Sequence, residues 1–169
     1  MEVVDAFKRG NFKVMGLCET KLKGNGEEEW NNCGVKCIRA GVSETSRRAK
    51  EGVGMLICQE WYEKMSSFEC VSSRCLIVKF KFPKVKVAVI VAYAPCEDRE
   101  ESVKNDFWRE LNAVIERVPR SFRKIVMGDM NGKVGTVPER DVVGPYGVDG
   151  ENDNGRRMKD LCRELRLCV

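Results

Sequence analysis

The apolar residues of this chain fall in runs no longer than a β-strand. The longest run, residues 85–95, already contains Lys86. No window approaches the roughly 18 uncharged apolar residues of a membrane-spanning helix. Similar runs recur at residues 12–20, 35–40, 52–58, 75–82 and 124–127. The chain is therefore expected to build its core largely from buried strands and to lack a membrane span.

Helical patterns frame these strands. Residues 2–10 predict a short helix ending at Gly10, and apolar spacing predicts a long helix over 97–117 and an amphipathic one over 154–165. The alternating pattern predicts a meander of three strands at residues 68–71, 75–82 and 84–93. A short buried strand is expected at 124–127 and the start of a further strand at 167–169. Between them, residues 132–150 are expected to form a long loop. Helices at both ends of an antiparallel centre predict a four-layer α/β/β/α sandwich.

Composition narrows the chemistry. The chain has 169 residues, enough for one domain, with 30 Lys and Arg against 26 Asp and Glu. It has no His, which excludes Ser-His and Cys-His nucleophile pairs and His metal ligands. The nine Cys form no CxxC pair, and residues 1–13 lack an export signal. We expect free, mostly buried thiols in an intracellular protein, nuclear or cytoplasmic and not secreted.

Three polar positions follow predicted strands. Glu19 ends the apolar strand 12–20, and Tyr93 ends the strand 84–93. Asp129 and Asn131 follow the strand 124–127, where an extended chain would point both side chains the same way. A carboxylate beside a carboxamide suits a hard divalent cation and a phosphate. Each position also has a plain alternative, namely a solvated charge, a surface phenol or a turn.

Two further candidates are weaker. Asn154 precedes an amphipathic helix, where an N-cap is the ordinary role of Asn. Arg47 and Arg48 lie in a polar, basic loop that could follow a phosphate backbone, although such runs are usually solvated faces.

In order along the chain, these motifs resemble the endonuclease/exonuclease/phosphatase superfamily, which has the deoxyribonuclease-I-like fold. The branch that they most resemble is the craniofacial development protein 2-like branch, which is similar to non-LTR retrotransposon endonucleases. The resemblance spans essentially all 169 residues. It is carried by GLCETK at 16–21, GVGM at 52–55, VAYAP at 91–95, GDMNG at 128–132, GPYG at 144–147 and NGRRM at 154–158.

The resemblance implies metal-dependent phosphodiester hydrolysis of nucleic acid, DNA ahead of RNA, with Mg²⁺ or Mn²⁺ as cofactor. By position, Glu19 matches the metal-binding glutamate and Tyr93 the tyrosine that contacts the scissile phosphate. Asp129 matches the aspartate that orients or deprotonates the attacking water. Asn131 matches the partner of that aspartate in binding the phosphate. Asn154 matches a further phosphate-contacting position, and Arg47 and Arg48 are expected substrate contacts.

Two motifs of the superfamily have no match here. These are a first strand bearing Asn and a late Asp-His motif. The expected chain is therefore a single domain, residues 1–169, truncated at both termini, with weak or no hydrolysis. Three alternatives stay open: a phosphatase or lipid phosphodiesterase of the same superfamily, a non-catalytic binding module, and a relic of a retroelement.

Overall fold

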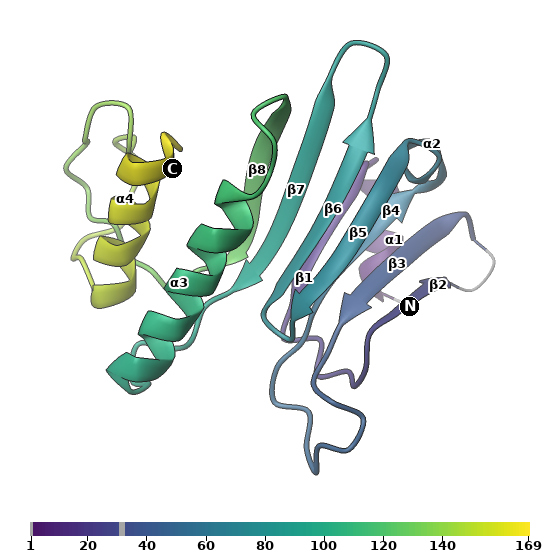
Figure 1. Ribbon diagram of the computed structural model, residues 1–169, viewed down its shortest axis with the longest axis horizontal. Coiled ribbons are helices and arrows are strands. Elements are labelled where there is room, and N and C mark those ends of the chain that lie inside the picture. Colours follow the sequence, from purple (N-terminus) through teal and green to yellow (C-terminus); the bar gives the residue numbers. More distant parts are fainter. Residues whose placement is uncertain (1, 31–32) are drawn as a thin grey trace. The chain divides into compact units, whose positions relative to one another are not determined.

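The computed structural model describes residues 2–30 and 33–169, and the chain folds as two compact units (Figure 1). Unit 1 comprises Met1–Tyr93 and Arg120–Gly128, and unit 2 comprises Ala94–Pro119 and Asp129–Val169. No helix in the described part of the chain is long and apolar enough to cross a bilayer. The prediction of a single domain that lacks the first strand and the C-terminal strands of the superfamily that the motifs resemble stays a prediction.

Unit 1 contains two four-stranded sheets, with strand orders β1-β4-β3-β2 and β5-β6-β7-β8. Neighbouring strands pair antiparallel throughout the first sheet and along β5-β6-β7 of the second. The elements are α1 (Glu2–Arg9), β1 (Val14–Cys18), β2 (Gly26–Glu29), β3 (Val35–Ala40), β4 (Val53–Cys58), α2 (Gln59–Tyr62), β5 (Met65–Ser72), β6 (Cys75–Lys81), β7 (Lys86–Tyr93) and β8 (Phe122–Asp129, whose last residue belongs to unit 2).

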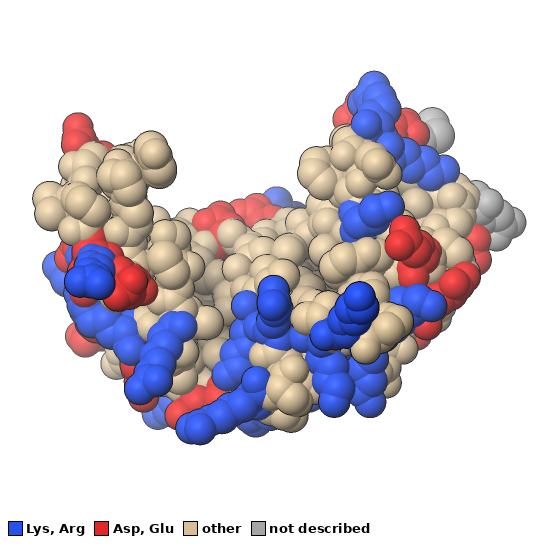
Figure 2. All heavy atoms as spheres, turned by 90° about the horizontal axis from the view of Figure 1, so that it is seen from above, with Lys and Arg blue, Asp and Glu red and all other residues tan. Residues whose placement is uncertain are grey.

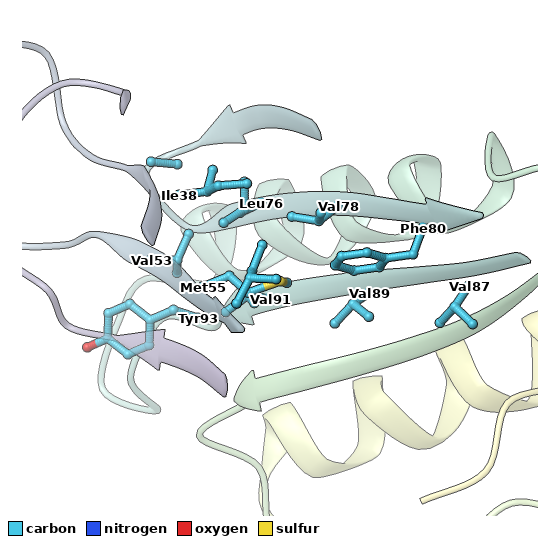
Figure 3. Close-up of a cluster of buried hydrophobic side chains, with 12 residues drawn as sticks. Ile38, Val53, Met55, Leu76, Val78, Phe80, Val87, Val89, Val91 and Tyr93 are labelled. Carbon is cyan, nitrogen blue, oxygen red and sulfur yellow. The ribbon is translucent and has the colours of Figure 1, made fainter. Parts of the chain in front are cut away.

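The two sheets of unit 1 pack face to face around one apolar cluster (Figure 3). Successive side chains of a strand point to opposite faces, so every second residue enters this interface. In β4 these are Val53, Met55 and Ile57, and in β7 they are Val87, Val89, Val91 and Tyr93. The α/β class with two packed sheets is confirmed.

Helix α1 covers the opposite face of the first sheet. Val4 and Phe7 pack against Val35, Cys37 and Leu56, which alternate with the residues that face the other sheet. Unit 1 therefore stacks a helix and two sheets, and the helix at the start of the chain was correctly predicted.

Unit 2 contains α3 (Glu101–Glu116), α4 (Asp153–Leu165) and the long segment 129–152. Asn152 caps α4, because its side chain accepts a hydrogen bond from the Gly155 N–H at 2.8 Å. An apolar cluster of Val142, Val143 and Cys162 ties the long segment to this helix.

Several expected elements differ from those observed. The prediction of a short buried strand at 124–127 is wrong, because β8 is longer and half-exposed, with Ile125 44% exposed at the edge of its sheet. Residues 167–169 form no strand, although the Val169 N–H donates to the Val142 carbonyl at 2.8 Å. Strand β2 was missed because its sequence, GEEE, has no apolar residue; Glu28 and Glu29 instead pair with basic side chains of β3.

The thiols of the described residues form no disulfide bond. Three of them, Cys37, Cys75 and Cys162, are buried, while Cys96 and Cys168 are exposed. Burial raises the pKa of the Cys37 thiol to about 11, which makes this group unreactive near neutral pH.

Gly128 is required by a close approach of two strands. Its φ is +135°, and a Cβ at this position would lie 1.9 Å from the Ala92 carbonyl oxygen. We expect Gly128→Ala to lower the free energy of unfolding by more than the roughly 1–3 kcal/mol of backbone strain alone. Gly34→Ala is the matched control, since Gly34 has φ +71° but open space around it. Denaturant titration of both variants measures the difference, and equal losses would contradict the close approach.

Candidate functional site

The hydroxyl of Tyr93 donates a hydrogen bond to the Glu19 carboxylate, at 2.9 Å between Oη and Oε1. Glu19 follows the last residue of β1, and Tyr93 is the last residue of β7. The two residues lie 74 positions apart in the sequence. The fold therefore brings together the first two residues that the sequence singled out within unit 1.

Close packing of β1 against β7 produces this contact. A Cβ on Gly16 would lie 3.3 Å from Val91 and 3.1 Å from Met127, so a larger residue would push β1 outward. Further along, the Cys18 thiol lies 3.7 Å from the Ala92 carbonyl oxygen. Because Cys18 and Ala92 directly precede Glu19 and Tyr93, this packing places the two candidate side chains at the same end of the sandwich.

Tyr93 is held on its other side by Arg74. The guanidinium lies 4.9 Å from the centre of the Tyr93 ring, and its Nη1 donates to the Tyr93 carbonyl oxygen at 3.0 Å. Glu51 accepts from Arg74 Nη2 at 2.7 Å and also from the Ser73 hydroxyl at 2.7 Å. Only 5% of Tyr93 is exposed, and Figure 3 shows its hydroxyl pointing away from the neighbouring apolar side chains. The phenol is thus fixed in direction before any ligand arrives.

Sequence reasoning missed Arg74 and Glu51. Both are charged residues in polar segments, and nothing in their spacing distinguishes them from surface charges. Their role becomes visible only when the β5–β6 turn is placed beside the end of β7.

Glu19 is the exposed member of the pair. Its side chain is 53% exposed, and Oε2 lies 4.0 Å from the Lys21 ammonium. Its backbone has φ +53°, a left-handed conformation uncommon for Glu. The next residue anchors this turn, since the Thr20 N–H donates to the Gly52 carbonyl at 3.0 Å. An oxygen that faces solvent beside one tethered by a phenol is a suitable ligand for a hard cation.

In unit 2, Asp129 and Asn131 form a turn. The Asp129 carboxylate accepts from the Asn131 N–H at 2.9 Å, and Asn131 has φ +47°. The expected extended chain with both side chains pointing the same way is therefore wrong here. The side chain of Asp closes the turn, and Asn adopts the left-handed conformation more readily than most residues.

Both ends of this turn are bonded to the segment that follows Tyr93. The Asn131 amide donates to the Ala94 carbonyl at 2.8 Å, and the Ala94 N–H donates to the Asp129 carbonyl at 2.8 Å. Asn152 adds a third tie, since its amide donates to the Asn131 carbonyl at 2.9 Å. Asn131 therefore holds the turn, while the Asp129 residue stays exposed.

Asn154 is fully buried, and both ends of its amide have protein partners. Its Oδ1 accepts from the Trp108 indole N–H at 2.9 Å, and its Nδ2 donates to the Pro95 carbonyl at 2.8 Å. It follows the N-cap, Asn152, and is not the cap itself. These contacts are those of a structural residue, and its expected contact with phosphate stays a prediction.

Arg47 and Arg48 are exposed in the loop between β3 and β4, and neither forms an ion pair within the described ranges.

Of the predicted site residues, Glu19 and Tyr93 meet in unit 1. Asp129, Asn131 and Asn154 cluster in unit 2. The chain passes between the units at the peptide bonds 93–94, 119–120 and 128–129.

The donor set bears on metal binding. Within residues 2–30 and 33–169, no group of three or more acidic or Cys side chains forms a ready-made metal cage. Mg²⁺ does not require one, because it keeps most of its waters and binds through one or two carboxylates together with substrate phosphates. The exposed Glu19 carboxylate fits that mode of binding.

Comparison with solved structures identifies the fold. An AP endonuclease from Leishmania major matches with a TM-score of 0.65 and 11% identity, over 95% of this chain and 60% of that one. The endonuclease domain of TRAS1, a telomere-specific non-LTR retrotransposon, matches with a TM-score of 0.59 and 11% identity, over 97% and 64%. An endonuclease/exonuclease/phosphatase family protein from Leptotrichia buccalis C-1013-b matches with a TM-score of 0.56 and 11% identity, over 78% of this chain and 59% of that one. The chain thus has the fold of endonuclease/exonuclease/phosphatase proteins.

Sequence comparison adds a more specific likeness. The chain is 25% identical over 172 residues to craniofacial development protein 2 of Bos taurus, and over 166 residues to that of Tragulus javanicus. It spans about a quarter of the length of these relatives, 27% in each case. No family model matches the chain. The resemblance predicted from the motifs is confirmed by these relatives and fold neighbours.

An ion-pair cluster at the start of α4 supports the unit 2 turn. Asp153 accepts from Arg157 Nε at 2.7 Å and lies 3.0 Å from the Lys104 ammonium, whose side chain is only 9% exposed. The hydrogen bond from Arg157 is the largest cause, followed by that from Lys104, and together they lower the pKa of Asp153 from 3.8 to about 2. Its N–H also donates to Glu97 at 3.0 Å.

A carboxyl group whose pKa is lower in the folded than in the unfolded chain stabilises the fold at pH values above its unfolded-state pKa. This contribution is lost as the pH falls toward the folded-state pKa. We therefore expect Asp153→Asn to lower the melting temperature fully above about pH 4, and progressively less toward pH 2. Melting curves of both proteins across this range measure the effect. The exposed Asp149→Asn is the control, and a difference independent of pH would contradict the assignment.

Proposed function

We propose that this chain is a divalent-metal-dependent phosphodiesterase module that acts on nucleic acid. The observation that carries the proposal is the 2.9 Å contact between the Tyr93 hydroxyl and the Glu19 carboxylate. A core-anchored phenol beside an exposed carboxylate at a strand end is a suitable pair for a hydrated cation and a phosphate oxygen. The nuclease fold neighbours support this reaction class.

In this proposal, Glu19 holds Mg²⁺ or Mn²⁺, which when bound neutralises charge developing on the phosphate. Tyr93, oriented by Arg74, would redirect its hydroxyl hydrogen bond from Glu19 to a phosphate oxygen once the Glu19 carboxylate holds the metal. Asp129 orients the attacking water and accepts its proton. Asn131 keeps Asp129 in its turn. Arg47 and Arg48 contribute charge toward the polyanion, with DNA as the substrate ahead of RNA.

The chain supplies no imidazole, because it contains no His. Removing one member of a cooperative catalytic site costs orders of magnitude in rate. We therefore propose weak hydrolysis, and the same composition favours one second candidate, a module that binds nucleic acid without cutting it. The intracellular location and the choice between nucleus and cytoplasm stay predictions.

Cleavage of a labelled duplex in Mg²⁺ tests the proposal. We expect slow cleavage by the chain, abolished by EDTA, and a loss of about 10²–10⁴-fold in Glu19→Gln and Asp129→Asn. Tyr93→Phe keeps the ring and removes only the hydroxyl, so a smaller loss is expected. Asp149→Asn, an exposed Asp in the same unit as Asp129, should keep full activity.

Two results separate the candidates. Cleavage that persists in EDTA or in Glu19→Gln would contradict the metal-dependent mechanism. Binding of the duplex without cleavage under any metal condition would establish the binding module instead.

A further inference from the structure

The end of unit 1 farthest along β7 from Tyr93 is strongly basic. It is built by the β6–β7 turn and the start of β8, at the top of Figure 1. Residues 79–87 and 120–124 together contain seven Lys or Arg and no Asp or Glu. We call these seven residues the basic end; they are Lys79, Lys81, Lys84, Lys86, Arg120, Arg123 and Lys124. Lys86, at the start of β7, is seven residues from Tyr93, at its end, which corresponds to about 23 Å along the strand.

These side chains are left unneutralised. No member of the basic end forms an ion pair with a residue in the described part of the chain. Elsewhere in unit 1, Lys36, Arg39 and Arg74 each pair with a Glu. Figure 2, which views the molecule from this end, shows Lys and Arg atoms gathered across it.

Two features make this more than a scattered surface charge. Lys81 and Lys86 are directly opposite each other on β6 and β7. Like charges at such paired positions are destabilising, and a bound anion would relieve the repulsion. Beside them, a depression of about 330 Å³ is lined by Lys84, Lys86 and Arg123, and its charged lining residues are all basic.

We propose that the basic end is a second nucleic-acid surface, which binds the phosphate backbone independently of Glu19 and Tyr93. Lys and Arg on a concave surface contact phosphates without reading bases, so this binding is insensitive to sequence. The identity of the polyanion as nucleic acid rests on the proposed function. Its role there is to retain the polymer while the hydrolytic end samples it.

The test uses a fluorescent duplex of about 20 base pairs in EDTA, with anisotropy titrations between about 50 and 200 mM salt. The triple variant Lys84→Ala, Lys86→Ala, Arg123→Ala removes three positive charges. Each lost phosphate contact lowers the slope of log K against log salt by about 0.9, so we expect the slope to fall by about 2.7. The variant Lys84→Arg, Lys86→Arg, Arg123→Lys should keep the original slope.

A charge-matched control removes three other exposed basic residues, Lys8, Arg9 and Arg140. Unchanged melting curves for both triple variants confirm that the fold is retained. The proposal is overturned if the chain does not bind the duplex, if the first triple variant binds as the chain does, or if the control loses as much. It is also overturned if vesicles containing phosphatidylserine bind at the basic end and the duplex does not.

Failure of this proposal is distinguishable from failure of the proposed function. Glu19→Gln and Asp129→Asn should bind the duplex in EDTA with the salt slope of the unmodified chain. A chain that binds through the basic end but never cleaves keeps this inference and loses the hydrolytic one.

Discussion

Face-to-face packing of two sheets is the constraint on which the candidate site depends. Within the described part of the chain, twelve buried residues belong to this interface, and burial of one large aliphatic or aromatic side chain contributes about 1.5–3 kcal/mol. The hydrogen bond from Tyr93 to Glu19 contributes no more than about 1.5–3 kcal/mol, even as a charge-assisted bond. The contact is therefore a consequence of packing, and Gly16, which lets β1 approach Val91, matters as much to it as either polar residue.

Strand β7 links two kinds of surface in unit 1. Its residues from Val87 to Tyr93 are buried, so the strand acts as a rigid spacer. One end presents an oriented phenol and a carboxylate, which suit a cation and one phosphate. The other end presents Lys and Arg that form no ion pair with a described residue, and such side chains suit a run of phosphates. A polymer substrate has both features, whereas a small phosphate ester has only the first.

Much of this arrangement was predictable, because apolar alternation in β4, β6 and β7 is a direct consequence of burial. The motif residues Glu19 and Tyr93 were found at strand ends for the same reason. Strand β2 was not found, since its acidic side chains have partners elsewhere in the fold, among them Lys36 and Arg39 of β3 and the Tyr62 hydroxyl. A turn at Asp129 was an alternative that the sequence left open, and hydrogen bonds to Ala94 and Asn152, which depend on tertiary structure, decide in its favour.

Paramagnetic broadening by Mn²⁺ tests the central claim, that Glu19 and Tyr93 form one cation-binding end, most directly. In a ¹⁵N-labelled chain, substoichiometric Mn²⁺ should broaden the amide signals of Glu19, Thr20 and Tyr93 together, and Glu19→Gln should abolish this effect. Broadening at Thr20 without Tyr93, or broadening that survives Glu19→Gln, would contradict the account.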